Sequence, residues 1–139
     1  MRFAQDRYAK LLTALGARVP AEALNGALEE VGDFCASNSK VVTPFAGKPE
    51  EFLATMREKW HADVTHDAAA GVVTVAFPPM KACPCGLVRT GVTPATVCQC
   101  SIGWQRRAFS AVFGRPVRVE LKQSLLRGAD RCSFEIRMA

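Results

Sequence analysis

Apolar residues recur with helical spacing in the first sixty residues, which predicts three amphipathic helices. The apolar face of the first helix contains Ala4, Tyr8, Leu11, Leu12 and Leu15. We expect Gly16 to end this helix in the left-handed conformation that glycine adopts easily. The second helix begins near Pro20, and its apolar stripe runs to Phe34 and Cys35; we expect Cys35 to be a small core residue. The third starts at Pro49, because proline suits the first helical position.

After residue 62, apolar residues recur at every second position instead of with helical spacing. The segments DVTHD (63–67) and GVVTVAF (71–77) are joined by a short Ala/Gly stretch, which predicts a β-hairpin. A further helix is expected over SIGWQRRAFSAVFG (101–114), with Ser101 as its N-cap and Gly114 just past its end. This helix lies between the first hairpin and a second one at the end of the chain.

The second hairpin has the clearest alternation of apolar and polar positions, over residues 117–125 and 131–138. Such alternation predicts two antiparallel strands that are buried on one face only. A turn centred on RGAD (127–130) would place Leu121 opposite Ile136 and point Cys132 toward the core. The same register pairs opposite charges on the solvent face, each pair worth about 0.2 to 1 kcal/mol: Glu120 with Arg137, and Lys122 with Glu135.

Together these elements predict an α+β fold, with an antiparallel sheet of about four strands, N-terminal helices, and one helix between two hairpins. The chain has 139 residues, a length typical of one domain that buries its core without disulfides. We therefore expect a single domain over 1–139, with a helical part (1–62) and a part (63–139) that holds the sheet and most cysteines. The charged opening MRFAQDRYAK has neither a signal peptide nor a membrane span, so we expect a cytoplasmic protein.

The basic charge is confined to the last 39 residues. Ten Lys or Arg balance ten Asp or Glu through residue 100, whereas eight Lys or Arg face three acidic residues from Ser101 onward. Such clustering is also typical of nucleic-acid binding. However, no aromatic residues interleave with the basic ones as a base-stacking platform requires. We therefore interpret the charge as a solvated strand face that also compensates nearby thiolates, and we expect no nucleic-acid partner.

Four of the six cysteines lie in CPCGLVRTGVTPATVCQC (83–100), as two Cys-x-Cys pairs. In a reducing compartment, closely paired cysteines are more often metal ligands or redox groups than structural bridges. The candidate metal ligands are Cys83, Cys85, Cys98 and Cys100. Zinc and iron–sulfur clusters both accept such thiolates, and we favour zinc. Redox or disulfide chemistry and unligated thiols remain the alternatives, because Cys-x-Cys is tighter than the usual Cys-x-x-Cys.

The helix after Cys100 bears on the state of these sulfurs. Its N-terminus carries a partial positive charge near Ser101, and Arg106 and Arg107 follow one to two turns later. A cationic environment lowers the pKa of a thiol. We therefore expect ionised sulfur, which suits a metal site and a reactive thiolate equally.

The C-terminal third of the chain resembles a known family. The run CQCSIGWQRRAFSAVFGRPVRVELKQSLLRGADRCSFEI, residues 98–136, is similar to the 4-vinyl reductase-type ligand-binding domains and to L-2-amino-thiazoline-4-carboxylic acid hydrolase-like proteins. The resemblance implies an α+β domain whose helices and sheet enclose a pocket for a small, largely apolar or carboxylate-bearing molecule. It also implies a zinc-ligand role for Cys132, although Leu121 and Ser124 stand where related sensor domains have their further ligands.

Two functional hypotheses follow. In the first, a binding or sensory module holds its ligand in a pocket lined by Trp104, Phe109 and Phe134, and a cysteine-held metal braces the lid. In the second, the protein is an enzyme, either a metal-dependent hydrolase or a thiol or iron–sulfur reductase. A catalytic metal needs a nearby base, and the cysteine-rich segment supplies none, so we favour the binding module. A homodimer formed through a strand edge stays open.

Overall fold

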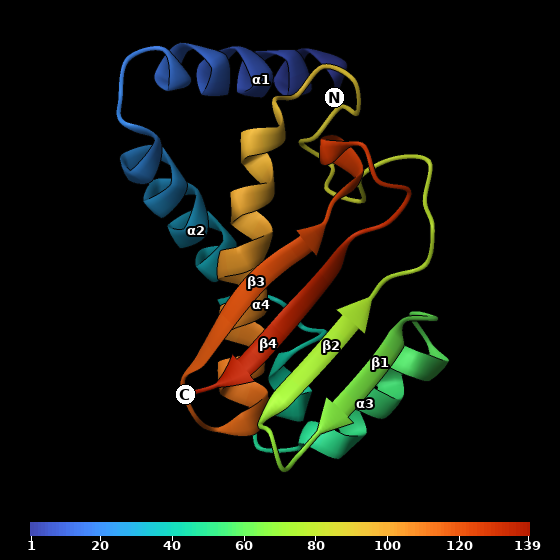
Figure 1. Cartoon of the computed structure of the whole chain (residues 1–139). Coiled ribbons are helices and arrows are strands. Elements are labelled where there is room, and N and C mark those ends of the chain that lie inside the picture. Colours follow the sequence, from blue (N-terminus) through green and yellow to red (C-terminus); the bar gives the residue numbers. More distant parts are fainter.

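The computed structural model describes all 139 residues as four α-helices, four strands and three 3-10 turns (Figure 1). The α-helices are α1 (Arg2–Gly16), α2 (Ala21–Ser37), α3 (Pro49–Glu58) and α4 (Gln99–Phe113). The strands are β1 (Asp63–Asp67), β2 (Val72–Ala76), β3 (Val117–Gln123) and β4 (Ser133–Met138). The 3-10 turns are η1 (Thr43–Phe45), η2 (Ala95–Cys98) and η3 (Leu125–Arg127). The α+β class predicted from the sequence is confirmed.

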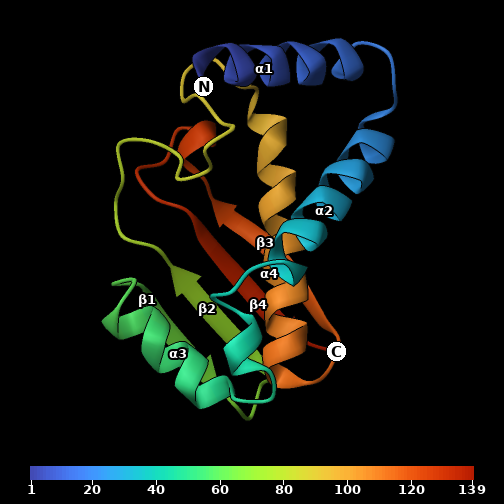
Figure 2. The same ribbon diagram turned by 180° about the vertical axis from the view of Figure 1, so that it is seen from behind.

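The strands form one antiparallel sheet in the order β1-β2-β4-β3. Helices α3 and α4 cover one of its faces, and no helix covers the other (Figures 1 and 2). Helix α2 packs against α4, and α1 crosses the far end of this helical layer. A long connection, residues 77–94, leaves β2 and returns to η2 and α4 beside α1. None of the helices has the length and apolar character needed to span a bilayer.

Helices α2 and α4 touch backbone to backbone through two glycines. A Cβ atom added to Gly32 would lie 1.8 Å from the carbonyl oxygen of Cys100. One added to Gly103 would lie 2.0 Å from the carbonyl oxygen of Glu29. Only glycine permits this approach, because any larger residue would push the helices apart. The crossing fixes the start of α4, and with it the side chains that α4 presents on its other faces.

The register of the β3–β4 hairpin differs from the one predicted. Leu121 pairs with Phe134, and Val119 pairs with Ile136, so the strands are offset by two residues. The reason is the connection: η3, a left-handed Gly128 and an irregularity between Leu121 and Gln123 replace a tight turn. Because the offset is even, each side chain keeps its predicted face.

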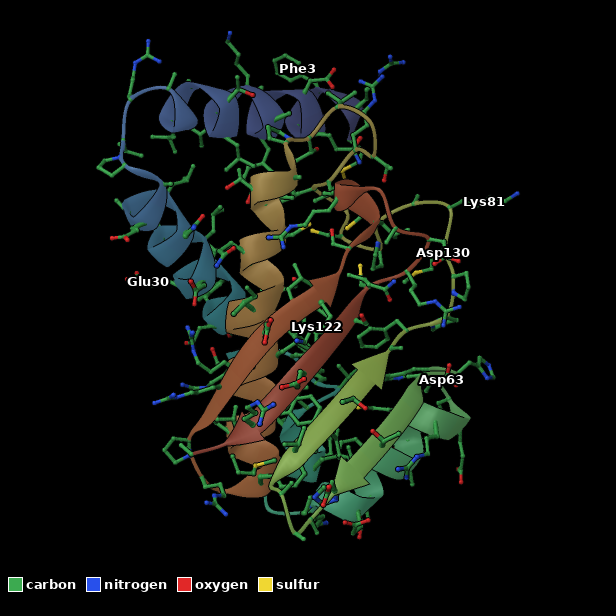
Figure 3. The ribbon with its side chains drawn as sticks, viewed as in Figure 1. Phe3, Glu30, Asp63, Lys81, Lys122 and Asp130 are labelled. Carbon is green, nitrogen blue, oxygen red and sulfur yellow. The ribbon has the colours of Figure 1, made fainter.

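The offset changes the charge pairing on the open face of the sheet. Glu120 now lies opposite Glu135, and like charges directly opposite are destabilising. Two cationic side chains offset the repulsion between these carboxylates. The Lys122 ammonium lies 3.1 Å from Glu120 and 3.7 Å from Glu135, and Arg137 lies 2.6 Å from Glu135. Figure 3 shows Lys122 on this uncovered face.

Three helix-end predictions have different outcomes. Gly114 adopts the expected left-handed conformation, with φ 68°. Gly16 does not, because α1 passes into a turn whose cap, Ala17, stays right-handed. Helix α4 begins at Gln99 rather than at Ser101, because η2 leads directly into it.

Phe34 and Cys35 were predicted to be buried, and both are exposed. Gly32 and Ala36 are the buried residues of this part of α2 instead. The close crossing at Gly32 rotates the packed face of the helix away from its apolar stripe. The prediction was therefore wrong because the smallest residues, and not the largest, form the contact.

The buried residues form two hydrophobic clusters. The larger lies between the sheet and helices α3 and α4, and includes Phe52, Phe109 and Ile136. The smaller joins α1, α2 and the long connection through Leu12, Leu24, Leu28, Val88 and Val97. The partly buried Cys98 and Cys132 pack against the larger cluster, whereas Cys83 and Cys100 pack against the smaller.

Candidate functional site

A cavity of about 530 Å³ is lined by residues of both clusters. Its walls come from α1, α2, the long connection, α4, η3 and β4, and 18 of its 22 lining residues are hydrophobic. The aromatic lining residues are Tyr8, Trp60, Phe77, Trp104 and Phe134. A volume of this size is typical of pockets that hold small molecules.

All six cysteines of the chain line this one cavity: Cys35, Cys83, Cys85, Cys98, Cys100 and Cys132. They arrive from α2, the long connection, η2, α4 and the segment before β4. None is in a disulfide. Figure 3 shows several sulfur atoms gathered where the long connection, the start of α4 and η3 meet. The fold therefore brings together the five cysteines predicted as site residues, and it adds Cys35.

Hydrogen bonds hold two of these thiols in place. The Cys98 sulfur lies 3.0 Å from the hydroxyl of Ser124, a residue that is only 1% exposed. The Cys100 sulfur lies 4.0 Å from the Tyr8 hydroxyl, a contact between α4 and α1. Ser124 also accepts a hydrogen bond from the backbone N–H of Arg127 and so caps η3. These contacts tie the cavity wall to neighbouring elements.

Burial favours the neutral form of three of the six thiols. It raises the pKa of Cys100 to about 11, against the opposing effect of the Tyr8 hydrogen bond. Burial likewise raises the pKa of Cys83 and of Cys132. The expectation of ionised sulfur therefore fails for these three residues. Desolvation of a thiolate outweighs the cationic surroundings that the sequence predicted.

The arginines expected to favour thiolates have other partners. Arg106 lies 2.6 Å from Glu29, and Arg107 lies 3.8 Å from Asp33, both on α2. Three further C-terminal basic residues form ion pairs: Lys122, Arg131 and Arg137. Most of the basic charge that is concentrated after residue 100 is thus matched by carboxylates within the chain.

The arrangement of the thiols does not match a metal site. No group of three or more His, Cys, Asp or Glu side chains has the spacing to hold a metal ion. A zinc site needs four ligands, and its cysteines must be deprotonated. Zinc would therefore require the thiols to move together, and Cys83, Cys100 and Cys132 to lose protons that burial favours. The metal predicted from the cysteine spacing stays a prediction.

The predicted aromatic pocket residues separate into two places. Trp104 and Phe134 line the cavity. Phe109 is fully buried in the larger cluster, where its ring lies 5.5 Å from that of Phe52 and 6.1 Å from that of Phe113. The helical period explains this difference, because residues 104 and 109 lie about 140° apart around α4.

Sequence reasoning missed one polar lining residue, Gln105. Its side chain is buried, with 4% exposure, and it lines the cavity. Its Oε1 is the one buried side-chain nitrogen or oxygen atom in the chain that lacks a hydrogen-bond partner. A glutamine beside arginines in an amphipathic helix gives no signal of burial, so the sequence offered no means of finding it.

Comparisons with known proteins identify a family model and several solved structures that match this chain. A family model described as a family of unknown function (DUF6144) matches residues 40–139. A comparison with curated protein sequences gives no match.

Three solved structures match the chain to different degrees. A phenol-responsive sensory domain of the transcription activator PoxR, solved with phenol, is 12% identical with a TM-score of 0.58, covering 96% of this chain and 74% of that one. A trafficking protein particle complex subunit 3 from Naegleria fowleri, covalently bound to palmitic acid, is 14% identical with a TM-score of 0.54, covering 100% and 97%. A vinyl-4-reductase family protein from Methanocaldococcus jannaschii is 14% identical with a TM-score of 0.42, covering 93% and 74%.

These likenesses concern the fold. At that level, the PoxR match agrees with the likeness to sensory domains expected from residues 98–136. The resemblance to the thiazoline carboxylate hydrolases stays a prediction.

Proposed function

The chain belongs to a family of unknown function, DUF6144, and from that premise we propose that it is a binding or sensory domain for a small, largely apolar molecule. The site is the cavity beside α4. Its occupant would be a neutral molecule, aromatic or short-chain aliphatic, whose apolar body lies among the aromatic side chains and the thiols.

The observation that carries this proposal is the apolar lining of an open cavity. Three of its lining residues keep much of their surface in solvent: Val31 is 45% exposed, Leu87 46% and Val41 49%. Burying apolar surface is worth about 25 cal/mol per Å². A ligand that covers this lining therefore gains free energy from the same effect that folds the chain.

The chemistry of the lining favours binding over catalysis. No Asp, Glu, His, Lys or Arg lines the cavity, so a general acid or base is missing from its walls. Burial raises the pKa of Cys83, Cys100 and Cys132, which makes these thiols weak nucleophiles at neutral pH. The absence of a cationic side chain also favours a neutral ligand over a carboxylate.

The fold offers further support. The PoxR sensory domain was solved with phenol, and the trafficking subunit with covalently bound palmitic acid. Both are apolar molecules with one polar end. By analogy of fold, a pocket in this architecture is suited to the ligand class that the lining indicates.

The test is titration calorimetry with phenol as the probe, on the wild type and on two variants of α4. Ser101 lines the cavity, whereas Ser110 lies on the same helix, is similarly half-buried, and does not. We expect Ser101→Phe to weaken phenol binding about ten-fold or more, which corresponds to about 1.4 kcal/mol, because the ring fills part of the cavity. Ser110→Phe should bind like the wild type. Equal effects of the two variants, or no binding by the wild type, would contradict the proposal.

A further inference from the structure

We propose that the outer face of α1 is a docking surface for a membrane that contains anionic phospholipids. Four exposed side chains define this outer face: Phe3, Arg7, Lys10 and Leu11. The proposal goes beyond the small-molecule cavity and does not depend on which ligand the cavity takes.

Helix α1 packs on the rest of the chain through one side only. Ala9 and Leu12 are buried, and Tyr8 lines the cavity. The four residues of the outer face fall within about 100° around the helix axis, turned away from these contacts. No other element covers α1 on this side in either view (Figures 1 and 2). The helix therefore presents a side that is open to a partner.

The basic residues of α1 and of the turn after it lack acidic partners. Four of them form no ion pair: Arg2, Arg7, Lys10 and Arg18. Asp6, the one acidic residue of α1, lies 2.7 Å from Arg89. The next acidic residue, Glu22, begins α2, which leads away from α1 (Figure 1). The long connection beside α1, residues 77–94, holds no acidic residue. The positive charge here is therefore unmatched, unlike most of the charge after residue 100.

Two large apolar side chains stand among these charges. Phe3 is 74% exposed and Leu11 is 53% exposed, and Figure 3 shows Phe3 pointing away from the body of the molecule. The Arg7 guanidinium lies 5.7 Å from the centre of the Phe3 ring, so basic and apolar groups share one surface. Exposed bulky apolar residues beside Lys and Arg are typical of helices that lie in the interface of a bilayer. The apolar groups enter the headgroup region, and the cations attract anionic lipids.

Two other partners fit this face less well. In a symmetric contact, a second copy of the chain would place the basic residues of α1 opposite one another, and like charges across an interface oppose association. Nucleic acid would match the charge. However, the face offers a single aromatic ring where base stacking needs several, and Leu11 gains nothing from a phosphate backbone. An anionic bilayer matches both the charge and the apolar groups.

The experiment is co-sedimentation of the full chain with vesicles of phosphatidylcholine, with and without phosphatidylserine. We expect binding only when phosphatidylserine is present. Each basic residue near an anionic surface strengthens partitioning about five-fold, so reversing one charge in Lys10→Glu should weaken it at least about ten-fold. Lys48→Glu is the matched control. Lys48 is exposed and forms no ion pair, and it precedes α3 at the opposite end of the molecule, so its reversal should have little effect.

A second pair of variants tests the apolar contact. Phe3→Ser should weaken binding to the same vesicles about five-fold or more, because the ring no longer enters the headgroup region. Phe34→Ser is the control, since Phe34 is a similarly exposed aromatic residue that lies on α2. This variant should bind like the wild type.

Several outcomes would overturn the inference. Absence of binding by the wild type, or equal binding to both kinds of vesicle, would refute it outright. Equal losses in Lys10→Glu and Lys48→Glu would show attraction by net charge alone, without a docking face. Wild-type binding by Phe3→Ser would show that the apolar groups take no part. If a single-stranded oligonucleotide binds through Lys10 and the vesicles do not, the face is a nucleic-acid site and the inference is wrong.

The cavity provides an independent check on the variants. Lys10 and Phe3 do not line it, so Lys10→Glu and Phe3→Ser should bind phenol with the wild-type affinity in calorimetry. Lost vesicle binding with intact phenol binding is the result we expect. A loss of both in the same variant would show that the change disturbs the fold, and would count against a role confined to the outer face of α1. Failure of phenol to bind the wild type would refute the proposed function and leave the vesicle result to decide this inference.

Discussion

The crossing of α2 and α4 allows a sharp test by adding one methyl group. In Gly103→Ala, the new Cβ would lie 2.0 Å from the carbonyl oxygen of Glu29. An ordinary contact of this kind is more than 1 Å longer, and the obstacle is backbone on both sides. The helices must therefore separate or bend, and both responses disturb the residues packed around the crossing.

The expected magnitude follows from two opposing effects. Replacing glycine by alanine inside a helix is favourable by about 0.5 to 1 kcal/mol when there is space. Overpacking a tight contact costs about 1 to 3 kcal/mol or more. Because the clash at Gly103 is severe, we expect a net loss of about 2 kcal/mol, which lowers Tm by about 8 °C in a domain of this size.

Gly26→Ala is the matched control. Gly26 lies in the same helix pair, on α2, and a Cβ there meets nothing within 4 Å. We expect this variant to be as stable as the wild type or to melt a few degrees higher. Thermal unfolding followed by circular dichroism compares the two. If Gly103→Ala and Gly26→Ala melt at the same temperature, the close crossing does not exist as described.

Other consequences concern the thiols, the buried hydroxyl and an ion pair. At neutral pH, iodoacetamide should label Cys100 far more slowly than the exposed Cys35. Labelling of Cys100 should accelerate as the pH rises to about 11, because burial raises the Cys100 pKa to about 11. Equal labelling rates of the two cysteines, measured by peptide mass spectrometry, would refute this. Ser124→Ala removes the buried hydroxyl that caps η3 and contacts a cavity thiol, so urea unfolding should show a loss of about 1 to 2 kcal/mol, and an unchanged midpoint would count against that role. Arg106→Gln breaks the ion pair with Glu29, whose partners are 42% and 21% exposed; the loss should stay below about 1 kcal/mol, and a larger one would show that solvent screens the pair less than we assume.

The periodic elements were predictable from the sequence because burial imposes a period. The three N-terminal helices, the first hairpin and the alternation in the last two strands all follow from apolar spacing. The strand faces of β3 and β4 were also predicted correctly. The register of these strands was not predicted correctly. It depends on the η3 connection, which uses the buried hydroxyl of Ser124 and the left-handed Gly128, and the hydrophobic pattern gives no signal of either.

The sequence placed several cavity residues near one another, but their roles stay predictions. The paired cysteines, Trp104 and Phe134 do share one cavity. Burial raises the pKa of Cys83, Cys100 and Cys132, and Arg106, which was expected to favour thiolates, is paired with Glu29. Cys35 is exposed although it lies on the apolar stripe of α2, because α2 packs on α4 through the close crossing at Gly32. That contact is made by glycines, which hydrophobic periodicity does not detect.

The central claim, that a small apolar molecule occupies the cavity beside α4, is tested most directly by locating such a molecule. The measurement is intermolecular nuclear Overhauser contacts between bound phenol and isotope-labelled protein. We predict contacts from the phenol ring protons to Trp104, Phe134 and Val97, all of which line the cavity. Contacts confined to Phe3, which is 74% exposed and points away from the body of the molecule (Figure 3), would contradict the account.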